Sequence, residues 1–143
     1  MTKAWTKFGR INGSDLGKRA IRVHICQSCG MWFEGTVPVQ CSCGRLAFDH
    51  FDSKGEARRW MRLRLLERAG EISELQRQVP FPLFTLTELG KPVQFAVYVA
   101  DYTYVEKGQK IVEDHKAMAG ISPEASLKLR VMEASGKPVR LTT

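Results

Sequence analysis

The sequence lacks any long hydrophobic run. No apolar stretch approaches the roughly 20 residues that a membrane-spanning helix needs, and residues 1–10 contain no apolar segment of the kind found in a secretory signal. Internal repeats are also missing, and cysteine is scarce, with four in the chain. These absences exclude a membrane span, a repeat architecture and a disulfide-rich scaffold. We therefore expect a cytoplasmic protein without a membrane partner, from a bacterium or a phage-infected cell.

The residues that are present suit a globular protein. Hydrophobic residues make up 43% of the 143 positions and charged residues 26%, enough for one compact domain, or a small domain with an appendage. The net charge is +7 and the isoelectric point about 9.5, which favours a polyanionic partner such as nucleic acid.

Much of the positive charge lies near the start of the chain. Residues 1–22 carry six basic side chains against Asp15 alone, together with three glycines. We predict a flexible basic arm over residues 1–20 that contacts DNA phosphates, although a solubilising tail would have the same composition. The predicted DNA-contacting residues of the arm are Lys3, Lys7, Arg10, Lys18 and Arg19.

All four cysteines fall between Cys26 and Cys43. They form two close pairs, each followed by a glycine: Cys26 with Cys29, and Cys41 with Cys43. Four thiolates at this spacing are typical of a closed structural Zn²⁺ site, so residues 21–47 are predicted to be a zinc ribbon with a short hairpin over 31–39. Free or redox-active thiols are the alternative, and His24 or His50 could replace one thiolate.

A helix is predicted from residues 52–53 to Ala69. Ser53 caps its start with Glu56 three residues later, and Gly70 ends it. An apolar face is expected to contain Ala57, Trp60, Met61, Leu65 and Leu66. Arginines are expected to cover the other side, where Arg58 and Arg62 would contact DNA phosphates.

Strands dominate the rest of the chain. We predict an extended segment over 75–84, strands over 93–105 and 110–116, a helix from Ser122 to about Ala134, and a last strand over 139–142. The order of helix, three-strand meander, helix and strand indicates an α/β fold for residues 48–143.

The two central predicted strands bring two aspartates together. If Lys107 and Gly108 form a two-residue hairpin loop, Asp101 lies directly opposite Asp114 and Lys116 lies opposite Val99. Facing carboxylates repel unless a cation compensates them, and hard oxygen ligands suit Mg²⁺ or Mn²⁺.

A lysine beside such a metal could activate water or stabilise charge on a phosphate. Asp101, Asp114 and Lys116 together therefore predict phosphodiester hydrolysis. A longer loop would instead bring Glu113 to the front, and Glu113 is otherwise expected to face away from the metal, as is His115.

Asp101 followed by Asp114-x-Lys116 on the next strand resembles the PD-(D/E)XK nuclease superfamily. Together with residues 51–58, 65–72 and 78–83, the pattern is similar to short phage-encoded endonucleases of the endonuclease I, Holliday-junction resolvase type. The resemblance covers about residues 48–134. One departure is Ala117, where glycine usually follows the lysine.

The resemblance implies a restriction-endonuclease-like core and a set of roles. Asp101, Asp114 and Glu56 would hold Mg²⁺ or Mn²⁺, Lys116 would be the catalytic lysine, and Gln78 would support the site. The implied function is a homodimeric endonuclease that resolves branched DNA such as Holliday junctions. The alternatives are a nicking or restriction-like endonuclease with another target, and a non-catalytic zinc-dependent DNA-binding adaptor.

Overall fold

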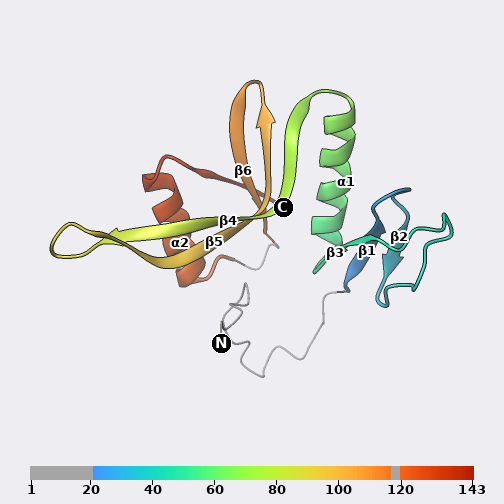
Figure 1. Cartoon of the computed structure of the whole chain (residues 1–143), viewed down its shortest axis with the longest axis horizontal. Coiled ribbons are helices and arrows are strands. Elements are labelled where there is room, and N and C mark those ends of the chain that lie inside the picture. Colours follow the sequence, from blue (N-terminus) through green and yellow to red (C-terminus); the bar gives the residue numbers. More distant parts are fainter. Residues whose placement is uncertain (1–20, 117–119) are drawn as a thin grey trace. The chain divides into compact units, whose positions relative to one another are not determined.

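The computed structural model describes residues 21–116 and 120–143 (Figure 1). The chain divides into two compact units, Met1–Ala57 and Arg58–Thr143, and each described part contains its own sheet. The fold is therefore mixed α/β, with two helices and two sheets in the described residues. The predicted basic arm, with Lys3, Lys7, Arg10, Lys18 and Arg19, lies outside the described residues.

The first unit is built on a three-stranded antiparallel sheet in the order β2-β1-β3. Its strands are β1 (Val23–Cys26), β2 (Trp32–Glu34) and β3 (Phe48–Phe51). The predicted hairpin within residues 31–39 is wrong, because β2 pairs with β1 across the first cysteine turn. Gly30 and Gly35 both have positive φ, so the chain turns before and after this short strand. The sequence grouped residues 48–51 with the second domain, whereas they form a strand of this sheet.

Helix α1 (Lys54–Arg68) begins and ends as predicted. The Ser53 hydroxyl accepts a hydrogen bond from the backbone N–H of Glu56 at 3.2 Å, and Gly70 follows the helix with φ 77°. The predicted apolar face is only partly correct. Ala57, Trp60 and Leu63 are buried, and Trp60 stacks on Tyr102 with 6.0 Å between ring centroids.

Two residues assigned to the apolar face of α1 are exposed instead. Met61 is 38% exposed and Leu65 63% exposed. The predicted set spans more than one side of a helix with 3.6 residues per turn, and only the side carrying Trp60 and Leu63 is buried.

The second unit contains a four-stranded sheet in the order β4-β5-β6-β7. Its strands are β4 (Ile72–Leu86), β5 (Pro92–Glu106), β6 (Gln109–His115) and β7 (Val139–Thr142). The first three form an antiparallel meander, and β7 pairs parallel to β6 after helix α2 (Pro123–Ala134). Ser122 caps α2 by accepting from the N–H of Ala125, which confirms the predicted cap.

β4 and β5 are longer than the sequence predicts. Beyond their pairing near β6 they continue as a two-stranded arm, and α2 lies against its base (Figure 1). The core at that base contains Leu83, Tyr98, Ala100, Val112 and Met132. In residues 21–116 and 120–143, neither helix is long and apolar enough to cross a membrane.

Candidate metal centres

The four cysteines of the first unit come together. Their sulfur atoms all lie within 4.8 Å of one another, with Sγ–Sγ distances of 3.6 Å between Cys26 and Cys43 and 3.5 Å between Cys29 and Cys41. All four are free thiols. The cluster is close enough to hold a metal, as the cysteine spacing predicted.

The electrostatics of these thiols suit a cation. Hydrogen bonds from the backbone of Cys29 lower the pKa of Cys26 to about 6, against the opposing effect of burial. A backbone hydrogen bond at Met31 lowers the pKa of Cys29, but the neighbouring thiols and burial outweigh it and raise that pKa to about 12. The raised pKa of Cys29 reflects the crowding of the thiols, which a divalent metal would relieve by supplying positive charge.

The two nearby histidines pair with each other and not with the cysteines. His24 Nδ1 lies 2.6 Å from His50 Nδ1, and His24 Nε2 lies 2.9 Å from the carbonyl oxygen of Gly35. Since Nε2 must donate to that carbonyl, Nδ1 of His24 accepts from His50. No histidine ligand is needed to complete the group of four cysteines.

In the second unit the β5–β6 hairpin has the predicted register. Glu106 pairs with Gln109, and the pairing runs up to Tyr102 opposite Glu113. Lys107 and Gly108 both have positive φ, as a two-residue type I′ loop requires. This register confirms the loop on which the pairing of Asp101 with Asp114 depends.

Asp101 is held by two donors. It is 1% exposed; the backbone N–H of His115 donates to Oδ2 at 2.9 Å, and Gln78 Nε2 lies 3.4 Å from Oδ1. Gln78 has φ 51°, a left-handed conformation that non-glycine residues rarely adopt. Strained backbone of this kind is often found at functional sites. His115 was expected to face away from the metal, and it is half-buried with its ring near Thr142.

Asp114 is buried at 1% exposure and poorly compensated. The Lys116 ammonium lies 2.6 Å from Oδ2, yet neither carboxylate oxygen receives a well-aligned hydrogen bond. Burial and then the adjacent Asp101 raise the pKa of Asp114 to about 6, although Lys116 opposes the rise. The carboxylates of Asp101 and Asp114 and the ammonium of Lys116 together leave a net negative charge at this buried site.

Tyr98 is a site residue that the sequence did not indicate. Its phenol is buried, and burial raises its pKa, with the charge and hydrogen bonding of Asp114 and the charge of Asp101 adding to the rise. Strand alternation assigns residues 98 and 101 to opposite faces. The structure nevertheless places the phenol close enough to interact with Asp114.

Glu113 faces away from Asp114, as predicted, and it forms hydrogen bonds with other side chains. Arg59 of α1 binds it through two hydrogen bonds of 2.6 and 2.7 Å, and the Tyr104 hydroxyl donates to it at 2.6 Å. Burial alone would raise the pKa of Glu113, but the bonds from Arg59 and Tyr104 hold it below its usual value. Arg59 is one of the arginines expected to cover the outer side of the helix, but it binds a buried residue of β6 instead.

Three predicted residues lie on α1. Arg58 and Arg62 are exposed, which leaves them accessible to an anionic partner. Glu56 is half-buried in the first turn and belongs to the first unit. Its role as a metal ligand stays a prediction.

A family model matches residues 45–143, more than half of the chain, and its description is "Protein of unknown function (DUF1064)". The chain belongs to the DUF1064 family. No curated protein matches the sequence, and no solved structure matches it. The DUF1064 match contains Asp101, Asp114 and Lys116 and begins after Cys43. The carboxylate site therefore lies inside the family region, whereas the cysteine cluster precedes it.

Proposed function

We propose that this DUF1064 protein is a divalent-metal-dependent endonuclease, with Asp101, Asp114 and Lys116 in its active site. The observation that carries the proposal is the buried carboxylate of Asp114. Both of its oxygens lack a well-aligned donor, with a second buried aspartate beside it and an ammonium 2.6 Å away. A buried carboxylate without compensation lowers the stability of the fold, and a bound cation would compensate its charge.

The donor set fits Mg²⁺ or Mn²⁺. Both cations prefer hard oxygen ligands, and Mg²⁺ commonly takes one or two carboxylates and keeps several waters. Asp101 and Asp114, both in the second unit, would hold the ion. When bound, the cation would supply positive charge against the scissile phosphate and make water a better nucleophile.

The chain's own residues would orient the reaction. Gln78 and the backbone N–H of His115 fix the two oxygens of Asp101. The Lys116 ammonium, held at Asp114, would donate hydrogen bonds to the attacking water or to the charge that develops on phosphate oxygen. Arg58 and Arg62, with the basic residues of the arm, would bind the DNA backbone, so that DNA shape counts more than sequence.

Branched DNA, as in a Holliday junction, is the proposed substrate, because the order of motifs resembles that of the phage endonuclease I class. The metal proposed for Cys26, Cys29, Cys41 and Cys43 is a structural Zn²⁺, since four thiolates close a tetrahedral site and leave no position for a substrate.

The test is Mg²⁺-dependent cleavage of labelled four-way junctions, flaps, nicked duplex and plain duplex. We expect the wild type to cut the junction best, and the Asp101→Ala and Lys116→Ala variants to bind it while cleaving at least ~100-fold more slowly. Lys110→Ala is the matched control for Lys116→Ala, because Lys110 is an exposed lysine of β6, the strand that Lys116 directly follows. Cleavage by Lys116→Ala at the wild-type rate would contradict the assignment.

The same panel separates the alternatives. Preferred cutting of nicked or plain duplex would indicate a nicking or restriction-like endonuclease. DNA binding without cutting of any substrate, with zinc bound, would indicate a non-catalytic adaptor.

A further inference from the structure

The pairing of β5 with β6 ends where the candidate metal site begins. The last paired residues of this ladder are Tyr102 and Glu113. Two residues further along β6, the backbone N–H of His115 donates to Oδ2 of Asp101 at 2.9 Å. The Asp101 carboxylate therefore takes the place that a backbone carbonyl has in a regular ladder, and its orientation depends on where the backbone of His115 lies.

On the other edge of β6, strand β7 holds the same segment. The two strands pair in parallel up to His115 opposite Thr142. The backbone N–H of Lys116, which directly follows β6, donates to the carbonyl oxygen of Thr142 at 2.8 Å. Thr142 therefore fixes the backbone of the residue whose ammonium lies against Asp114.

The hydroxyl of Thr142 adds two side-chain contacts to this backbone bond. Its Oγ1 donates to Oε1 of Glu113 at 3.4 Å, because an ionised carboxylate can only accept. The same oxygen lies 3.4 Å from Nδ1 of His115, which then donates to it. Each of these contacts is long and weak. Together with the backbone bond, they attach the segment that contains Asp114 to β7 at three residues.

We propose that Thr142 is a positioning residue of the candidate metal site. Through the Lys116 backbone and the His115 ring, it keeps the lysine ammonium at Asp114 and the His115 N–H at Asp101. Its hydroxyl contacts side chains on the face of β6 opposite to Asp114, so Thr142 acts through these residues and not on the cation. The proposal deepens the proposed endonuclease function and rests on it, because it adds a residue to the same site.

A threonine in a strand can also serve the sheet alone. Its branched side chain favours extended backbone, and valine has a similar shape and the same preference without the hydroxyl. Thr142→Val therefore removes both hydroxyl contacts and keeps the strand, whereas Thr142→Ser keeps a hydroxyl. A role in the sheet alone predicts that neither variant changes the affinity for a divalent cation.

Binding of Mn²⁺ to the full chain, purified with Zn²⁺ and followed by electron paramagnetic resonance of the free ion, tests the proposal. We expect Thr142→Val to raise the Kd about tenfold, the lower end for residues that orient metal ligands, and Thr142→Ser to stay within about twofold of the wild type. The Mg²⁺ concentration at half-maximal cleavage should rise in parallel, while KM for the junction stays unchanged. An unchanged Kd in Thr142→Val, or no recovery in Thr142→Ser, overturns the proposal.

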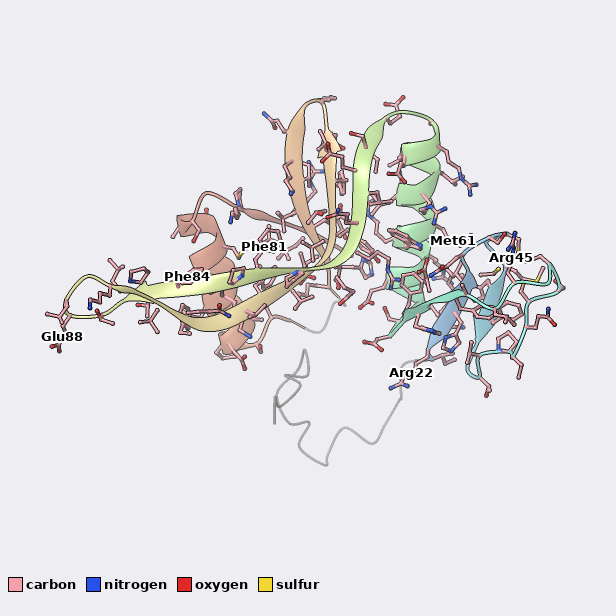
Figure 2. The ribbon with its side chains drawn as sticks, viewed as in Figure 1. Arg22, Arg45, Met61, Phe81, Phe84 and Glu88 are labelled. Carbon is pink, nitrogen blue, oxygen red and sulfur yellow. The ribbon has the colours of Figure 1, made fainter. Side chains whose placement is uncertain are left out.

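Thr85→Val is the matched control, because Thr85 is an exposed strand threonine of the same sheet. Thr85 pairs with Val93, beyond the residues of β5 that pair with β6. Figure 2 shows the preceding residue, Phe84, on the β4–β5 arm and Glu88 at the tip of the arm. This variant should bind Mn²⁺ with the wild-type Kd, and an equal loss of affinity in Thr85→Val would contradict a specific role for Thr142.

Amide hydrogen exchange of the metal-free chain, measured by NMR, separates this proposal from the proposed function. In Thr142→Val the amides of residues 115 and 116 should exchange about tenfold faster, whereas that of Met132 within α2 keeps its rate. Equal acceleration of all three amides would indicate general destabilisation and contradict positioning. Unchanged exchange at residues 115 and 116, in a wild type that does bind Mn²⁺, overturns the role of Thr142 alone. A wild type that neither binds Mn²⁺ nor cleaves DNA overturns the endonuclease function, and this role with it.

Discussion

Replacing Asp114 with asparagine should stabilise the protein while abolishing cleavage. Asparagine keeps the size of the side chain and removes the charge. The wild-type carboxylate is 1% exposed, stands beside Asp101, and has only the Lys116 ammonium to offset it. Removing a charge that the folded state disfavours raises the free energy of unfolding.

The size of the gain follows from the pKa. A folded-state pKa of about 6 for Asp114, against 3.8 for the free side chain, corresponds to about 3 kcal/mol at neutral pH. This value already includes the opposing effect of the Lys116 ion pair, so we expect a net gain of about 1–3 kcal/mol. Because the folded-state pKa lies above the unfolded value, the penalty is absent below pH ~4, grows through pH ~6 and is complete above it.

Chemical denaturation at several pH values without Mg²⁺ measures this directly. Asp114→Asn should exceed the wild type in free energy of unfolding at pH 7.5, and the two proteins should converge near pH 4. The melting temperature at pH 7.5 should rise by roughly 3–10 °C. Adding Mg²⁺ to 10 mM should stabilise the wild type by about 1.4 kcal/mol if its Kd is near 1 mM, and should leave the variant nearly unchanged.

The adjacent residue supplies the matched control. Glu113→Gln also removes a buried carboxylate charge of β6, but it leaves the Arg59 guanidinium without its bidentate partner. We expect a loss of about 3–5 kcal/mol. If Asp114→Asn is destabilised at pH 7.5 as Glu113→Gln is, then the carboxylate is not under electrostatic strain and the reasoning from its pKa fails.

Three further predictions concern single features of the two units. Gln78→Gly should raise the free energy of unfolding by about 1 kcal/mol, because glycine relieves the positive φ, and should cleave DNA more slowly. Glu74→Gly, also at positive φ, should be stabilised by a similar amount and keep full activity. Equal cleavage by both variants would refute a role for the Gln78 amide. Arg59→Lys should lose about 1–3 kcal/mol in urea unfolding, because an ammonium cannot form the bidentate pair with Glu113. Metal analysis of the purified chain should give one Zn²⁺ per copy, and Cys29→Ser should lower that content; full retention in the variant would contradict the four-cysteine site.

Local signals in the sequence were sufficient for several elements. The β5–β6 register follows from a two-residue loop, because Lys107 and Gly108 can both adopt positive φ and the loop length then fixes every pair. The caps at Ser53 and Ser122 follow from side chains that reach their own helix within three residues. In each case the interaction lies within a few residues of the chain, where spacing alone determines the geometry.

Long-range partners could not be predicted in the same way. Arg59 binds Glu113 and Tyr98 approaches Asp114 because helix and sheet pack in three dimensions, and nothing in the spacing of these residues indicates it. The hairpin within 31–39 was wrong for a related reason. β2 pairs with β1 across the cysteine turn, so its partner lies outside the segment in which the hairpin was expected.

Glu113 and Asp114 are neighbouring carboxylates of β6 with different surroundings, and only the charge of Glu113 is well compensated by its neighbours. Alternation puts Glu113 and Asp114 on opposite faces of one strand, so both are buried but in different surroundings. Glu113 receives an arginine, a tyrosine hydroxyl and a threonine, and its low pKa reflects a charge that stabilises the fold. Asp114 receives a lysine and a second carboxylate, and its raised pKa reflects a charge that the fold tolerates at a cost. Since single domains have only about 5–15 kcal/mol of stability, a penalty of about 3 kcal/mol at Asp114 is large, and binding a divalent cation there is the use that would offset it.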